Sequence, residues 1–66
     1  MLSQIVDKNR ARDTAVRFLQ RYHTIVRVGR TMLEDGVWQV DVFVSSPTRR
    51  RLHVEIDAAT GNILCF

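Results

Sequence analysis

The chain has 66 residues, of which 45% are apolar and 26% are charged, and it carries a formal net charge of +3 and one cysteine. This composition is typical of a globular domain and excludes a disordered segment and an internal disulfide; no apolar run approaches the roughly 18 residues of a membrane span. The first ten residues lack the basic start and apolar stretch of an export signal, so we expect a cytoplasmic protein whose residues 1–66 form one domain. A core this small is thin, and association with a protein partner or into a homodimer would support it.

The first predicted element is an amphipathic helix. Its apolar side chains recur at the spacing of one helical face: Ala11, Ala15, Phe18, Leu19 and Tyr22. Most of the basic surplus of the chain lies on the other side of this helix. Two starts are compatible with the sequence. Either Asp7 caps a helix that begins directly after it, or the helix begins at Ser3 and places Ile5 and Val6 over the edge of the core.

Residues 24–33 are predicted to form the first strand, because they are rich in β-branched side chains. We expect one face of this strand to carry three apolar side chains: Val26, Val28 and Met32. Gly29 and Arg30 interrupt the alternation and predict a bulge. Residues 34–36, with the sequence Glu-Asp-Gly, then predict a tight turn, since glycine adopts positive φ without strain.

The clearest pattern is that of residues 37–44, where polarity alternates with the two-residue period of a half-buried strand. One face carries Trp38, Val40, Val42 and Val44, and the other carries Val37, Gln39, Asp41 and Phe43. Residues 45–48 predict a turn. The third predicted strand directs Leu52, Val54 and Ile56 inward and Arg51, His53, Glu55 and Asp57 outward.

Residues 57–61 predict a second tight turn, in which Asp57 accepts a backbone hydrogen bond and Gly61 takes the left-handed conformation. Residues 62–66 complete a short fourth strand. Because short turns join antiparallel neighbours, the predicted class is α+β. We expect one N-terminal amphipathic helix packed on a four-stranded antiparallel β-meander, in the order α-β-β-β-β.

The second half of the chain resembles the PepSY and PepSY-like domains. The resemblance rests on residues 36–42, Gly-Val-Trp-Gln-Val-Asp-Val, and on residues 54–64, which are similar to the family's strand, Asp-Ala-x-Thr-Gly turn and closing strand. An upstream helix bearing Ala11 and Ala15 fits the same order. The resemblance implies a non-catalytic binding or inhibitory domain, since several members accompany peptidases as propeptide or regulatory modules, and members are mostly secreted or membrane-attached.

Side chains that could support catalysis or bind a metal are few. His53 can pair with Glu55 on its own strand face or with Asp41 on the neighbouring strand, which is typical of an exposed cross-strand contact. We expect His53 and Cys65 to face opposite sides of the sheet, and two ligands are too few for a structural zinc site. The sequence therefore predicts no enzyme activity, no cofactor and no metal. Cys65 is either a buried apolar residue or a reactive or intermolecular thiol.

A candidate interaction surface is predicted on the sheet face away from the helix and on the turn beside it. Its residues are Phe43, Asp41, His53, Glu55, Arg49, Arg50 and Arg51. We expect this surface, or an edge strand, to bind a protein partner or a second copy of the chain, and no small-molecule substrate is indicated. An apolar patch on it would combine Phe43, Phe66, Leu33 and Leu64.

Nucleic-acid binding is the alternative function. The run Arg49 to Arg51 and the arginines of the helix would contact phosphates. The predicted sheet face offers one aromatic platform, Phe43, and the sequence contains no recognised nucleic-acid-binding motif. Protein binding is therefore the preferred interpretation.

Overall fold

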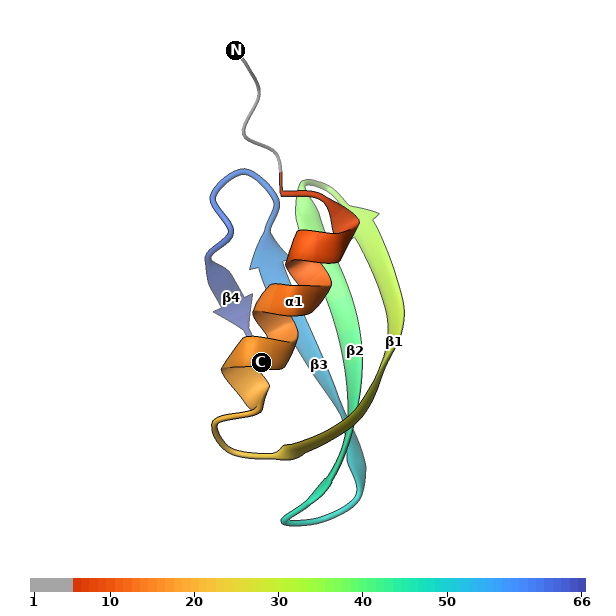
Figure 1. Ribbon diagram of the computed structural model, residues 1–66. Coiled ribbons are helices and arrows are strands. Elements are labelled where there is room, and N and C mark those ends of the chain that lie inside the picture. The colour runs from red at the N-terminus through yellow and green to blue at the C-terminus, as the bar shows by residue number, and fades with distance from the viewer. Residues whose placement is uncertain (1–5) are drawn as a thin grey trace.

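The computed structural model describes residues 6–66, which form one helix followed by a four-stranded antiparallel sheet. Helix α1 spans Lys8–Leu19, and the strands are β1 Thr24–Glu34, β2 Val37–Ser46, β3 Arg50–Asp57 and β4 Ile63–Cys65. The strands lie in the sheet in their sequence order. Helix α1 covers one face of this sheet (Figure 1). The predicted α-β-β-β-β architecture is confirmed.

The helix begins where Asp7 caps it. The Asp7 carboxylate accepts a hydrogen bond from the backbone N–H of Arg10 at 2.8 Å, which satisfies one of the donors left free at a helix N-terminus. Of the two predicted starts, the cap at Asp7 is confirmed; Ser3 and Ile5 lie outside the described residues. The helix has 12 residues, and no helix in the described part of the chain is long and apolar enough to cross a membrane.

The core lies between α1 and the inner face of the sheet. The buried strand side chains follow the predicted alternation: Val40, Val42, Val44, Val54 and Ile56. They pack against the small and aliphatic residues of the helix stripe, Ala11, Ala15 and Leu19. Trp38 closes one end of this core. Its indole N–H donates to the Val6 carbonyl at 2.6 Å, and the Val6 N–H donates to the Ala58 carbonyl, so the segment before the helix is held against the sheet.

Strand β1 is the least regular strand, because its register against β2 shifts at three places. The bulge predicted at residues 29–30 is confirmed, but the predicted common face of Val26, Val28 and Met32 is wrong. Val28 packs against the core, whereas Met32 lies opposite Gln39 on the other face and Val26 is exposed. Each bulge inserts an extra residue, so the side chains beyond it change faces relative to a simple alternation.

Two of the turns have the predicted conformations. Asp35 and Gly36 have φ values of 52° and 76°, as a two-residue hairpin turn requires. In the β3–β4 turn, the Asp57 carboxylate accepts a hydrogen bond from the Ala59 N–H at 2.8 Å, and Gly61 has a φ of 82°. The most distinctive stretch of the sequence therefore has a structural role as a turn.

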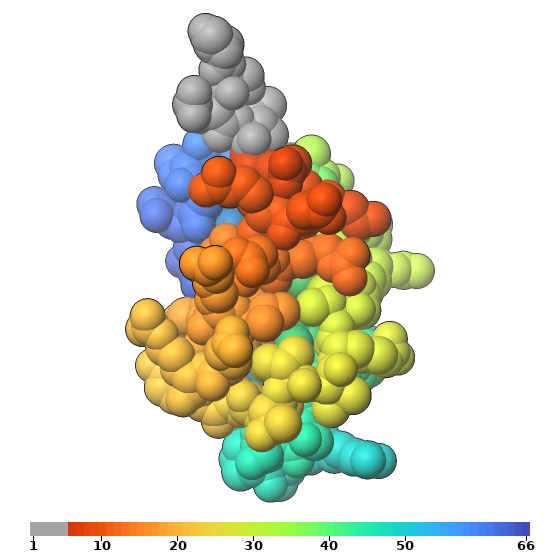
Figure 2. All heavy atoms as spheres, in the orientation of Figure 1, coloured from red at the N-terminus to blue at the C-terminus, as the bar shows by residue number. Residues whose placement is uncertain are grey.

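The β2–β3 hairpin is longer than the helix that covers it. Strand β2 continues to Ser46, two residues beyond the predicted end. The hairpin tip, coloured teal, projects past the helix in the space-filling view (Figure 2). The His23 ring joins the base of this tip to the turn after α1, with Nδ1 at 3.0 Å from the Ser46 carbonyl oxygen. Residues near the tip, including Arg49, are exposed.

Candidate functional site

The sheet face turned away from α1, which we call the open face, receives side chains from all four strands. Cross-strand partners place Phe43 between Arg27 and Arg51, and Gln39 between Met32 and Glu55. The same register also places six further residues on the open face: Glu34, Val37, Asp41, His53, Asp57 and Cys65. Arg30, which lies in the β1 bulge, lines a hollow on this face with Asp41 and His53. Five residues of the predicted interaction surface thus lie together on the open face: Asp41, Phe43, Arg51, His53 and Glu55.

Charge divides the open face into two ends. The basic end, toward the β2–β3 turn, contains Arg27, Arg49 and Arg51 around Phe43. The acidic end, toward the other two turns, contains Glu34, Glu55 and Asp57. The open face therefore carries positive charge at one end and negative charge at the other, which produces an electric field along the strands.

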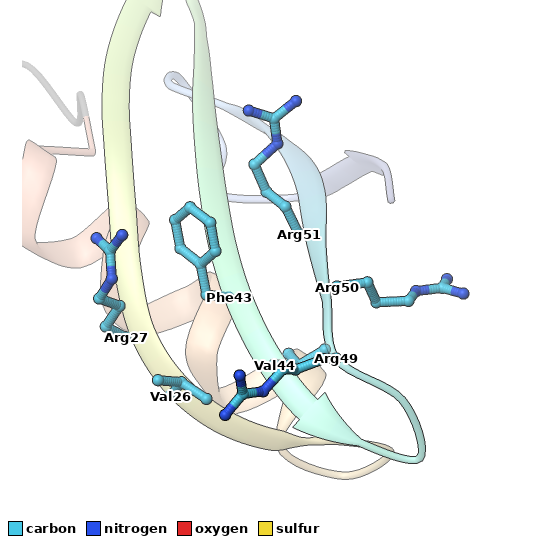
Figure 3. A pocket seen from close by; sticks show the side chains of 7 residues that line it. All are labelled: Val26, Arg27, Phe43, Val44, Arg49, Arg50 and Arg51. Carbon is cyan, nitrogen blue, oxygen red and sulfur yellow. The ribbon is translucent and has the colours of Figure 1, made fainter.

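A hollow of about 470 Å³ lies at the basic end and is shown in Figure 3. We call it the arginine hollow, and its lining residues are Val26, Arg27, Phe43, Val44, Arg49, Arg50 and Arg51. The guanidinium carbon of Arg27 lies 4.2 Å from the centroid of the Phe43 ring, which is a cation–π contact. Phe43 is half-buried beneath this contact. The hollow therefore combines an apolar floor with a cationic rim.

Gly29 makes room for the Phe43 ring. A Cβ atom at Gly29 would lie 2.7 Å from Cε2 of Phe43, closer than two carbon atoms approach without displacement. The ring consequently packs against the β1 backbone at the bulge. Arg27 is not among the predicted surface residues, because the irregular register of β1 brings it beside Phe43. The available signal was a glycine inside a strand, since such a glycine often marks the close approach of another group.

The three consecutive arginines do not form one patch. Arg51 is the cross-strand partner of Phe43 on the open face, whereas Arg50 is the partner of Val44, whose side chain is buried in the core. Successive strand residues point to opposite faces, which separates these two side chains. Arg50 accordingly extends away from the Phe43 ring (Figure 3) and also lines a second hollow on the helix side with Phe18 and other residues.

His53 lies between two carboxylates. Its Nδ1 is 3.0 Å from Oδ1 of Asp41, and its Nε2 is 3.5 Å from Oε2 of Glu55, so both predicted pairings are formed. Within residues 6–66, no hydroxyl or thiol side chain hydrogen-bonds to His53. A histidine placed to activate a nucleophile would need such a contact. His53 therefore links Asp41 of β2 to Glu55 of its own strand.

The prediction that His53 and Cys65 face opposite sides is wrong. Cys65 is the cross-strand partner of Glu55, on the open face, because a register shift separates that pair from the pair Ile56 and Ile63. Cys65 is also a free, exposed thiol, so the alternative of a buried apolar cysteine is wrong as well. The structure brings Cys65 near the acidic end of the face.

The predicted apolar patch is not formed. Phe66 packs against Phe18 of α1, with ring centroids 4.6 Å apart, and so lies on the helix side of the sheet, away from Phe43. Phe18 also contacts Tyr22, which lies in the turn after the helix. The two remaining members, Leu33 and Leu64, belong to the opposite edge strands β1 and β4. The predicted patch residues are thus divided among both faces and both edges.

The chain matches one protein-family model, PepSY, described as the peptidase propeptide and YPEB domain, over residues 5–64. The matched range begins before α1 and reaches into β4, and it includes both stretches on which the resemblance was based, residues 36–42 and 54–64. Comparisons with curated proteins and with solved structures give no match. The match therefore rests on nearly the whole sequence rather than on its turn alone.

Proposed function

Since this chain belongs to the PepSY family, we propose that it is a non-catalytic regulatory module that binds a protein partner through its open face. PepSY domains are often propeptide, inhibitory or regulatory modules, and they act in general by interacting with proteins. That general role fits a small domain with an uncovered sheet face. The environment of His53 is in keeping with a non-catalytic role, because both of its ring nitrogens face carboxylates.

The observation that carries the proposal is the position of Phe43. It lies on the open face, half-buried beneath Arg27, with Arg51 on its other side. Aromatic and arginine side chains are enriched at the centres of protein interfaces, where they supply much of the binding energy. A partner that covers Phe43 would bury its remaining surface together with the stacked guanidinium. The partner can be another protein or a second copy of this chain.

Site-specific photocrosslinking tests this proposal in the cells that make the protein. A photoreactive amino acid replaces Met32, which lies exposed on the open face, or Asp13, which lies exposed on α1 and serves as the control. We expect a discrete protein adduct from position 32 and none from position 13. An adduct of twice the chain mass would identify the partner as a second copy. Equal adducts from both positions would contradict the proposal.

Nucleic-acid binding is the second candidate function, and the arginine hollow is the observation that favours it. Arginines beside an aromatic ring can contact phosphates while a base stacks on the ring. Crosslinked adducts that nuclease removes, together with a salt-sensitive mobility shift of an oligonucleotide, would support this candidate. The absence of any shift at low salt would remove it.

A further inference from the structure

We infer, building on the proposed function, that the arginine hollow binds an acidic segment of the partner protein and seats an apolar side chain on Phe43 between two carboxylates. The first reason is uncompensated charge. Four arginines line the hollow and no acidic residue does. Within residues 6–66, the ion pairs involve Arg17 and His53 and none of these arginines. The ligand must therefore supply the negative charge.

The acidic side chains of the open face are engaged elsewhere. Asp41 contacts His53 at 3.0 Å, and Glu34 accepts a hydrogen bond from the Gln39 amide at 2.8 Å. Asp57 accepts its hydrogen bond within the β3–β4 turn. Neutralising the hollow from within would require one of these contacts to break. The positive charge of the hollow is thus a stable property of the folded domain.

The contact between Arg27 and Phe43 prepares the guanidinium for a carboxylate. The ring holds the guanidinium at 4.2 Å through a cation–π contact. A cation–π contact occupies no hydrogen-bond donor, so the guanidinium N–H groups that point away from the ring stay available to an external acceptor. Carboxylates bind such a planar fork through two parallel hydrogen bonds. Because the ring already restrains the side chain, binding a carboxylate there costs less conformational entropy than at a free arginine.

The spacing of the site favours an alternating acidic and apolar segment. Arg27, Phe43 and Arg51 lie side by side on β1, β2 and β3, so the backbones of the two arginines are about 10 Å apart at the usual separation of strands. In an extended peptide, residues i, i+2 and i+4 point to the same side at intervals of about 7 Å. The long arginine side chains can bridge this difference. The pattern that fits is acid-x-apolar-x-acid, lying across the strands.

The charge division of the open face favours a short acidic peptide over a nucleic acid. A nucleic-acid strand carries a negative charge at every nucleotide. A strand that left the hollow along the sheet would pass Asp41, which lies with Arg30 and His53, and would then reach the acidic end, where Glu55 and its neighbours would repel its phosphates. Among the open-face residues, Phe43 alone offers an aromatic platform, whereas single-strand binding uses successive stacked bases. A peptide can place its two carboxylates in the hollow and carry no further negative charge.

An NMR titration of the isotope-labelled chain tests this inference directly. The probe is the capped peptide Gly-Glu-Ser-Leu-Ser-Glu-Gly, with two matched controls in which Gln replaces both Glu residues or Gly replaces Leu. We expect shifts of backbone amides concentrated at Arg27, Gly29, Phe43 and Arg51. Affinity should fall as salt concentration rises, because exposed charges are screened. Both control peptides should bind more weakly, the Gln peptide by roughly tenfold or more.

Substitutions in the hollow provide the second arm. Arg27→Gln and Arg51→Gln should each lower the affinity for the peptide roughly fivefold, as expected for exposed charge-assisted contacts. Arg21→Gln removes the same charge from the turn after α1 and should leave the affinity unchanged. Arg50→Gln should have a smaller effect than Arg51→Gln, since its side chain extends away from the ring (Figure 3). Circular dichroism establishes that each variant is folded.

Three outcomes would overturn the inference. If Arg21→Gln and Arg51→Gln lowered the affinity for the peptide equally, the binding would be explained by the net positive charge of the protein rather than by the hollow. An oligothymidylate of equal charge that bound more tightly than the peptide, with the same dependence on Arg27 and Arg51, would identify the ligand as nucleic acid. If no backbone amide shifted at millimolar peptide concentration, the inference that the hollow binds an acidic segment would be wrong. In that last case the crosslink at Met32 decides separately whether the open face still binds a protein.

Discussion

The two faces of the sheet are built from alternate residues of the same strands, yet they obey different constraints. The inner face is close-packed and apolar, with side chains such as Val40 and Val54 fully buried under α1. The open face carries arginines at one end, carboxylates at the other and one half-buried aromatic ring. Packing determines the first face and charge organises the second. The exposed charged side chains therefore lie on the face where substitutions are expected to affect stability less.

The largest effect on stability is expected for a substitution on the inner face. Ile56→Ala should lower the free energy of unfolding by about 2–5 kcal/mol, since it removes a fully buried side chain and leaves a cavity. Glu55→Ala, one residue earlier on the open face, should change it by less than about 0.5 kcal/mol. Urea denaturation measures both values. Similar losses for the two variants would show that the two faces do not differ as the structure indicates.

The next largest effect on stability is expected at Gly29, where the Phe43 ring of the open face packs against β1. Gly29→Ala should cost about 1–3 kcal/mol, because the new Cβ would displace the Phe43 ring. In a Phe43→Ala background the same substitution should be neutral or stabilising, since alanine is less flexible than glycine in the unfolded chain. A double-mutant cycle from urea denaturation measures this coupling. An equal cost in both backgrounds would mean that Phe43 does not lie against Gly29.

A smaller effect on stability is expected at helix α1, which covers the inner face. Asp7→Ala should reduce stability by about 1 kcal/mol, because it removes the hydrogen bond that caps α1. Asp13→Ala is the control. It removes an exposed pair with Arg17, worth about 0.3–0.5 kcal/mol. Thermal unfolding followed by circular dichroism separates these values. A larger loss at Asp13 would be at odds with a helix start at Asp7.

The smallest effect is expected at the centre of the open face. Asp41→Asn keeps the shape of the side chain but removes the charge that faces His53, and it should cost less than about 1 kcal/mol. The same change should strengthen binding of the acidic peptide, since it removes a negative charge next to the arginine hollow. Denaturation and the peptide titration measure the two quantities. Weaker peptide binding would contradict the proposed position of the ligand.

The regular parts of the fold were predictable because their patterns are local. Strands β2 and β3 alternate without interruption, and their turns contain glycine where positive φ is required, at Gly36 and Gly61. The helix cap at Asp7 was one of two predicted starts, and its hydrogen bond to Arg10 confirms it. Each of these features depends on residues close together in the sequence.

The errors lie in the edge strands. The predicted face of Met32 was wrong because bulges shift β1 against β2, and the predicted face of Cys65 was wrong because β4 shifts against β3. A shift of one residue reverses the face of every side chain beyond it. The number and position of such shifts depend on how each edge strand fits its neighbour. The same effect concealed Arg27, the residue that completes the arginine hollow.

The order of elements, the inner face of strands β2 and β3 and the β1–β2 and β3–β4 turns follow from the sequence, because periodicity and turn chemistry act over a few residues. Which charges meet depends on the tertiary structure. It brought Arg27 onto Phe43 and left the arginine hollow without a carboxylate among its lining residues. Those contacts join residues from three strands, and their geometry depends on the register between strands, which no single segment encodes.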